Sequence, residues 1–448
     1  MTALVAVLLG GAVLVWPAGL NHYPLVFIDT VSYLLHTTAP EVPWDKTQAY
    51  GPFLHLFHWE RSLWGPLVAQ GLVASHLVWL AQRAVRGRAG LAWHLLVCAG
   101  LAGLTAAPWF LATLMPDAFT ALVPLALFLL AFGGLRRGEA WWVGALATLF
   151  IAAHLSHLPT VLAVLGTIPL LAWKAGPVLR AAAPALAAVL LLCLANLAAF
   201  DRFTPSPHGA AFLLARLQAD GPATAVVRDR CPAAGWHLCA FADRLPIDSD
   251  EFLWDPASPL NTEPDGSPRP MGAMRGAAEA QAIIAETLAT HPGEVALAAL
   301  RNALAQLVKT AVGDTLVDDH LVLSARRAIA GYFPPEELAA FDAGAQMRGT
   351  LPALAEPFLL PHLPVLLGSA LLAPWLAWRR GLRRGGAGSA LLAIALVALL
   401  ANAAATGALS KPHHRYQARI AWLLPLAVGL VLLPRAARPA AIPPAARA

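Results

Sequence analysis

Residues 181–200 read AAAPALAAVLLLCLANLAAF and contain no charged side chain. A helix of about 20 apolar residues is long enough to cross the hydrocarbon core of a bilayer. Similar runs recur along the chain of 448 residues, of which 58% are hydrophobic and only 13% are charged. This composition is typical of a multi-span membrane protein and not of a soluble enzyme.

Ten apolar runs are expected to span the membrane. They lie at about residues 2–20, 64–82, 90–108, 117–134, 141–158, 160–173, 181–200, 357–378, 388–409 and 418–434. The first run has no basic start and no small-residue cleavage site, so we expect a span and not a cleaved signal peptide. The sequence therefore predicts an all-α polytopic membrane protein with about ten transmembrane helices.

Five basic clusters separate these runs. They are Arg83/Arg86/Arg88, Arg136/Arg137, Lys174/Arg180, Arg379/Arg380/Arg383/Arg384 and Arg435/Arg438. If the spans alternate in direction, all five fall on one side, which the positive-inside rule identifies as cytoplasmic. Both termini are then cytoplasmic, and we expect a bacterial inner (plasma) membrane protein. The clusters are not interleaved with aromatic residues for base stacking, so nucleic acid is excluded as a partner.

The runs divide the chain into three predicted parts. Residues 1–200 form an N-terminal transmembrane domain with candidate catalytic outer loops, and residues 357–448 form C-terminal transmembrane helices. Residues 201–356 carry 20 acidic and 12 basic residues and no comparable apolar run. This middle part is therefore predicted to be an inserted, mainly helical extracytoplasmic domain.

Periodic apolar residues predict the helices of this inserted domain. The expected helices are Ala210 to Ala219, Arg275 to Thr290 and Glu294 to Val312. The last of them has an apolar face that we expect to lie on the membrane or on the other spans. Residues 247–274 contain several prolines and are expected to be irregular, either a loop that closes over a substrate or a poorly ordered connection.

The sequence FIDTVSY at residues 27–33 places a carboxylate just after the first apolar run. The loop around it, residues 21–62, mixes acidic residues with Trp and His, as membrane interfaces do. Asp29 is the candidate catalytic base, and Asp117, in the next outer turn, is a second candidate catalytic carboxylate. Because Asp29 precedes Thr-Val-Ser, an ordinary helix N-cap is the alternative.

His154 and His157 lie in the turn between the fifth and sixth runs. Arg137 and Lys174 are both assigned to the cytoplasm, which leaves too few residues for two full-length helices. The turn is therefore expected below the membrane surface, with both histidines on one helical face. Polar groups at that depth need a wet cavity or partners, so the two residues are either substrate-binding groups or satisfied packing histidines.

Residues 411–419, KPHHRYQAR, place cations on the outer side against the positive-inside trend. Arginine presents a planar fork of donors that matches phosphate oxygens, so this loop predicts a site for a substrate phosphate or an anionic lipid head group. Arg415 and Arg419 are one helical turn apart, so one face presents both. The candidate binding residues are Lys411, His413, His414, Arg415 and Arg419.

The four cysteines divide by location. Cys98 and Cys193 lie in apolar runs and are expected to be packing residues. Cys231 and Cys239 lie in the outer domain, where an oxidising compartment favours a disulfide between them. A zinc site is the alternative, although only His237 is nearby as a further ligand.

This arrangement resembles the integral-membrane glycosyltransferases of the GT-C type, which use polyprenyl-phosphate-linked sugars as donors. The resemblance rests on an outer loop with Asp29 followed by Ser32-Tyr33, on Asp117 in the next outer loop, and on the late cationic loop. It covers residues 1–200 best, and it implies that Tyr33 contacts substrate.

The resemblance implies an inverting sugar transfer on the extracytoplasmic face to a glycan, lipid or protein acceptor. Asp29 would accept the proton of the acceptor hydroxyl. Arg415 and Arg419 would stabilise the leaving phosphate, while Asp117 would orient the acceptor or share a divalent cation with Asp29. The alternatives are a lipid or solute transporter or flippase, and a non-catalytic envelope assembly protein.

Overall fold

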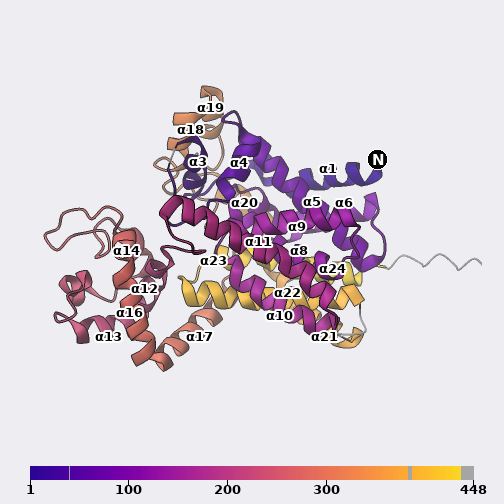
Figure 1. Ribbon diagram of the computed structural model, residues 1–448. Helices are drawn as coiled ribbons and strands as arrows, with labels where there is room; N and C mark the ends of the chain where they lie inside the picture. The colour runs from indigo at the N-terminus through magenta and orange to yellow at the C-terminus, as the bar shows by residue number, and fades with distance from the viewer. Residues whose placement is uncertain (40, 382–385, 435–448) are drawn as a thin grey trace, which may run out of the picture.

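The computed structural model describes residues 1–39, 41–381 and 386–434 (Figure 1). Within these ranges the regular elements are all helices, which confirms the all-α class. The expected basic residues Arg383, Arg384, Arg435 and Arg438 lie outside the described residues.

Each apolar run of the first 200 residues is helical. The elements are α1 (Thr2–Leu14), α2 (Pro17–Asn21), α3 (Thr30–Thr38), α4 (Tyr50–His58), α5 (Trp64–Arg86), α6 (Leu91–Leu104), α7 (Ala107–Leu111), η1 (Pro116–Phe119), α8 (Leu122–Phe132), α9 (Arg137–Ala153), α10 (His157–Ala172) and α11 (Ala175–Phe200). The 17 residues of α9 and the 16 of α10 agree with the short hairpin expected there.

The last part of the chain is also helical. Its elements are α18 (Ala325–Tyr332), α19 (Pro335–Asp342), α20 (Leu351–Leu359), α21 (His362–Arg380), α22 (Gly386–Leu409), α23 (His414–Ala421) and α24 (Leu423–Leu432). Helix α20 continues into α21, so that Leu351–Arg380 acts as one long apolar helix.

Three helices of the described residues are long and apolar enough to cross a membrane: α11, α20 with α21, and α22. The count rises to four if α5 and α6, which are bent by 116°, form one broken span. The other apolar runs form shorter helices. The structure is therefore that of a helical protein with three or four helices able to span a membrane, and the expected count of about ten spans stays a prediction.

Arginines of two predicted basic clusters bond the end of α24 and the residues after it. Arg86, in the last turn of α5, donates to the Pro434 carbonyl at 3.1 Å, and Arg380, at the end of α21, donates to the Val431 carbonyl at 2.7 Å. Helices α12 to α16 lie at the opposite end of the molecule (Figure 1). If the spans alternate in direction, as the sequence predicts, the basic clusters and the inserted segment lie at opposite ends of the helices.

The inserted segment begins with a separate group of helices. They are α12 (Gly209–Ala219), α13 (Pro222–Arg230), η2 (His237–Arg244), α14 (Ser249–Trp254), α15 (Gly272–Arg275), α16 (Ala277–Thr290) and α17 (Pro292–Val308). The expectation of an irregular segment from residue 247 is wrong at α14, because the Asp248 side chain caps this helix by accepting the Asp250 N–H at 2.9 Å.

The inserted segment contributes to two apolar cores. Residues of α12 to α16 form a small core of their own. Helix α18 and its neighbours instead join the large core, which the helices of residues 1–200 and 351–432 form and which contains the candidate spans; these helices are called the membrane body below. The Glu337 carboxylate accepts a hydrogen bond from the Tyr23 hydroxyl at 2.6 Å, and the Gln346 side chain bonds both the N–H and the carbonyl of Val26. Residues 337–346 therefore fasten the segment that leads into the Asp29 loop.

Helix α17 packs closely against α22. Gly407 permits this contact, because a Cβ at this position would lie 2.6 Å from the Asn302 carbonyl oxygen. The opposite face of α17 exposes Leu297, Leu300 and Leu304. The sequence predicted an apolar face that lies on the membrane or on the other spans; α17 has one face packed on α22 and a second apolar face that is exposed.

Gly407→Leu should lower the free energy of unfolding by about 1–3 kcal/mol, because the added side chain forces α17 and α22 apart. The measurement is the thermal unfolding midpoint of purified protein. Gly368→Leu, on the long helix α21, is the control, since a Cβ there meets nothing within 4 Å. Equal midpoints for the two variants would show that the two helices do not pack closely at Gly407.

Candidate functional site

Helix α23 brings together four residues that the sequence singles out. Arg415 and Arg419 project from successive turns of this helix. Arg415 lies 3.4 Å from the Asp29 carboxylate, and Arg419 lies 3.1 Å from that of Asp117. The first, second and last predicted outer loops therefore meet at one charged cluster.

Asp29 occupies the N-cap position of α3, but its side chain makes no capping hydrogen bond. Its carboxylate instead contacts the Lys46 ammonium at 3.0 Å as well as Arg415. The Arg415 guanidinium also lies over the Phe27 ring, 4.4 Å from its centroid, which fixes its direction. The capping alternative thus accounts for the position of Asp29 and not for its partners.

Sequence reasoning missed Lys46. It is one of four lysines in the chain and lies in the same outer loop as Asp29. Its ammonium contacts the carboxylates of Asp29 and Asp45, at 3.0 and 2.6 Å. The available signal was a scarce lysine directly after Trp44 and Asp45 in a predicted outer loop, where the positive-inside rule disfavours cations.

The cations keep Asp29 ionised. Burial acts to raise the pKa of its carboxyl group, but Lys46 and Arg415 outweigh burial, and the pKa falls below its usual value. Burial acts to lower the pKa of Lys46, and Asp29 and Asp45 outweigh it, so that this pKa rises. The Asp29 side chain is still 24% exposed, so a molecule outside the protein can reach it.

The second pair is enclosed. The side chains of Arg419 and Asp117 are 0% and 4% exposed, and Arg419 also donates to the Ser156 hydroxyl at 2.9 Å. These contacts join α23 to η1 and to the turn between α9 and α10. Arg419 has no surface for a ligand, and its geometry suits the positioning of α23.

The two histidines of the α9–α10 turn do not share a helical face, because α9 ends before His154, whose backbone is extended, and His157 opens α10. Their ring centroids are 5.5 Å apart. His157 bonds Thr120 at 3.0 Å and the Phe150 carbonyl at 2.7 Å, while His154 bonds the Ser156 hydroxyl at 2.8 Å. Both histidines have the partners that the packing alternative requires.

Lys411 and His413 contact carboxylates other than Asp29. The Lys411 ammonium contacts Asp248 at 2.8 Å, and the His413 ring contacts Asp250 at 3.1 Å. These bonds connect the last outer loop to the start of α14. In this arrangement the two residues fasten the inserted segment to the membrane body.

Two other predicted contact residues also have partners within the protein. His414 accepts the Ala311 N–H at 3.1 Å. Tyr33 is 1% exposed and packs edge-on against Tyr50, with ring centroids 5.0 Å apart. Among the proposed substrate contacts that the structure describes, Arg415 thus lies nearest to the exposed carboxylate of Asp29.

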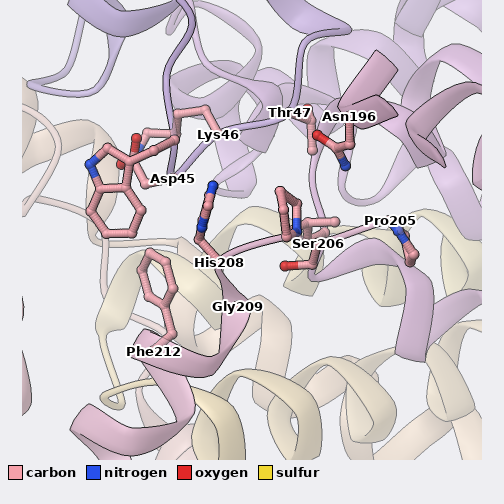
Figure 2. A pocket seen from close by; sticks show the side chains of 12 residues that line it. Asp45, Lys46, Thr47, Asn196, Pro205, Ser206, His208, Gly209 and Phe212 are labelled. Carbon is pink, nitrogen blue, oxygen red and sulfur yellow. The ribbon is translucent and has the colours of Figure 1, made fainter. Parts of the chain in front are cut away.

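A cleft opens beside the charged cluster (Figure 2). One wall is the first outer loop and the other is the chain that enters α12. Its cavity of about 20 Å³ has room for roughly one water molecule. The cleft is lined by Trp44, Asp45, Lys46, Thr47, Leu155, Asn196, Pro205, Ser206, Pro207, His208, Gly209 and Phe212. Lys46 belongs both to this cleft and to the Asp29 cluster.

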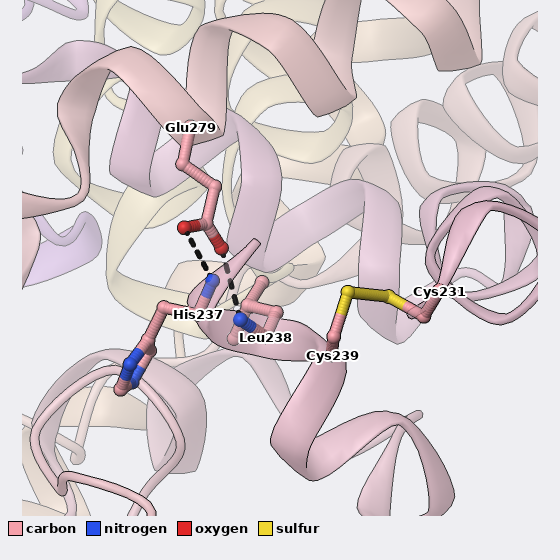
Figure 3. The surroundings of a disulfide bond; sticks show 5 residues. All are labelled: Cys231, His237, Leu238, Cys239 and Glu279. Atoms are coloured by element: carbon pink, nitrogen blue, oxygen red, sulfur yellow. Dashed lines mark hydrogen bonds between the residues drawn. A yellow bond between two sulfur atoms is a disulfide. The ribbon is translucent and has the colours of Figure 1, made fainter. Parts of the chain in front are cut away.

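Cys231 and Cys239 form a disulfide, so these sulfurs are not available as zinc ligands (Figure 3). Next to it, the Glu279 carboxylate accepts the backbone N–H groups of His237 and Leu238 at 2.8 and 3.0 Å. In the ranges that the structure describes, no group of three or more His, Cys, Asp or Glu residues is arranged to hold a metal ion.

Comparison with protein-family models, curated proteins and solved structures finds no match to this chain.

Arg419→Met should lower the free energy of unfolding by about 3–5 kcal/mol, because it leaves the Asp117 charge buried without a partner. Adding Asp117→Asn should recover most of this loss. Thermal unfolding of both variants measures the effect. Arg326→Met is the control, since Arg326 forms an exposed pair with Asp342, and the expected loss there is at most about 1 kcal/mol. Equal losses for Arg419→Met and Arg326→Met would contradict a structural role for the buried pair.

Proposed function

We propose that this protein transfers a sugar from a polyprenyl-phosphate-linked donor to an acceptor hydroxyl on the extracytoplasmic face of a bacterial inner membrane. The observation that carries the proposal is the partly exposed Asp29 carboxylate, held between the cations Lys46 and Arg415. A base and a pair of phosphate-binding cations are the groups that such a transfer needs.

In this proposal all ten apolar runs cross the bilayer. The short helices combine with their neighbours, as α1 does with α2 and α23 with α24, and the basic end of the body faces the cytoplasm. Both termini are then cytoplasmic, and α12 to α16 are extracytoplasmic. The Asp29 cluster lies at the outer surface, where a lipid-linked phosphate is within reach.

Donor binding would exchange one anion for another. In the free protein, Lys46 and Arg415 share the Asp29 carboxylate. A donor phosphate bound by the same cations takes part of their charge from Asp29, and Arg415 offers it a planar pair of donors. The loss of this stabilisation raises the proton affinity of Asp29. Binding of the donor therefore makes Asp29 a stronger base.

The chemical step follows from these positions. Asp29 takes the proton of the acceptor hydroxyl, and the hydroxyl oxygen bonds the anomeric carbon of the donor sugar. The bond between that carbon and the phosphate oxygen breaks, and its electron pair leaves with the phosphate. Lys46 and Arg415 stabilise this leaving group, while Arg419 and Asp117 hold α23 in place.

Asp29→Asn should abolish transfer without weakening donor binding, because the amide cannot accept the proton and no longer competes with the phosphate for Lys46 and Arg415. Arg415→Ala should instead weaken donor binding by roughly ten- to a hundredfold, the equivalent of a charge-assisted hydrogen bond worth about 1.5–3 kcal/mol. The two properties are measured separately on purified protein, as incorporation of labelled sugar and as binding of the polyprenyl-phosphate donor.

Asp265→Asn and Arg275→Ala are the controls, because both residues lie in the inserted segment away from the cluster. Both should behave as the wild type does. Wild-type turnover in Asp29→Asn would remove this carboxylate from the mechanism and favour a transporter. Unchanged donor binding in Arg415→Ala would remove the phosphate site.

A further inference from the structure

The cleft beside Lys46 contains a histidine whose ring has no hydrogen-bond partner. His208 is only 6% exposed, and both ring nitrogens are buried without a partner. Its ring lies between Phe200 and Trp44, with centroid distances of 5.0 and 6.4 Å, in the wall of the cavity (Figure 2). A buried polar group without a partner is costly, so these nitrogens are suited to a ligand or a bound water.

The ring is suited to a hydroxyl group. Burial, followed by the charge of Arg202, lowers the pKa of His208, so that the imidazole is neutral at neutral pH. A neutral imidazole has one nitrogen that donates and one that accepts. A hydroxyl group also donates and accepts, whereas an anion would meet a ring that offers one donor only. The polar end of the cleft thus favours an uncharged, hydroxylated ligand.

Trp44 and Phe212 line the cleft, and Trp254 packs against both of them, so that the three rings form an aromatic wall beside it. The ring centroid of Trp44 is 5.8 Å from those of both Phe212 and Trp254, and the latter two are 6.1 Å apart. Trp254 is 48% exposed although it belongs to this group. An exposed indole beside buried polar groups provides an apolar surface for one face of a ligand.

Lys46 connects this wall to the charged cluster. Its ammonium lies 5.7 Å from the centroid of the Trp254 ring and 3.0 Å from the Asp29 carboxylate. A ligand that covers Trp254 is therefore separated from Asp29 by one side chain. The aromatic wall thus contacts the charged cluster through Lys46 and contacts His208 through Trp44.

We propose that this surface binds a pyranose ring, whose C–H face lies on the Trp254 and Trp44 rings while one hydroxyl enters the cavity and bonds His208. The cavity of about 20 Å³ admits a hydroxyl and not a whole sugar, so the ring stays at the mouth. The proposal rests on the proposed function and deepens it, because it assigns the place of a sugar next to Asp29. The ring belongs to the donor sugar or to a saccharide acceptor.

The test is ligand-observed saturation-transfer NMR on purified full-length protein with the methyl glycosides of glucose, galactose and mannose. At least one glycoside should bind the wild type. Trp254→Ala should reduce that binding at least tenfold. Trp141→Ala, which removes an exposed indole from α9, is the matched control and should bind as the wild type does. No glycoside binding by the wild type, or equal binding by the two variants, overturns the proposal.

His208→Phe separates a ligand contact from a structural role. Phe keeps the ring shape and removes the two unpartnered nitrogens, so the thermal unfolding midpoint should stay the same or rise. Glycoside binding should fall about tenfold, the value of one hydrogen bond of roughly 1.4 kcal/mol. Unchanged glycoside binding would mean that His208 bonds only a water, and it would overturn the assignment.

Sugar 1-phosphates distinguish the two sources of the ring. If the donor sugar occupies the surface, they bind more tightly than the methyl glycosides, and Arg415→Ala removes the difference. If a saccharide acceptor occupies it, the two kinds of probe bind equally. Glycoside binding needs no turnover, so loss of binding in Trp254→Ala supports the surface even if Asp29→Asn were to retain full transfer activity.

Discussion

The buried pair of Arg419 and Asp117 is the contact on which the rest of the site depends. Two charges without solvent exposure are stable only when they remain together. The pair therefore fixes α23 against η1. The preceding turn of the same helix then directs Arg415 to Asp29. One enclosed ion pair thus sets the position of an exposed one. A partly exposed pair and a buried pair lie one helical turn apart.

The all-α class, with helices able to span a membrane, could be predicted because an apolar run of bilayer length indicates a membrane-spanning helix. Asp29 and the α23 arginines could be singled out because charges stand out in loops that the sequence predicts to lie on the outer side of a membrane. Lys46 was missed because a single lysine in a mixed loop resembles an ordinary surface residue. Lys411 and His413 were expected near the substrate, but their partners Asp248 and Asp250 lie far away in the chain, and no local pattern predicts such pairs.

The boundary of the inserted segment also depends on contacts between distant residues. Polar composition groups residues 201–356 together, whereas the Tyr23–Glu337 bond and the apolar residues of α18 bring its last part into the membrane body. The first part, α12 to α16, keeps a small core of its own and reaches the Asp29 loop through Trp44. The aromatic wall arises at this junction, where Trp44 meets Phe212 and Trp254, which follow it by more than 150 positions.

The central claim is that Asp29 lies at the outer surface beside a site for a lipid phosphate. It is tested by labelling an Asp29→Cys variant in intact cells with an impermeant thiol reagent, since the native cysteines are buried or paired. If Asp29 lies there, the reagent labels the variant in intact cells. Polyprenyl phosphate slows the labelling, whereas uncharged polyprenol leaves its rate unchanged. Labelling only after the membrane is opened, or equal protection by the two lipids, would contradict it.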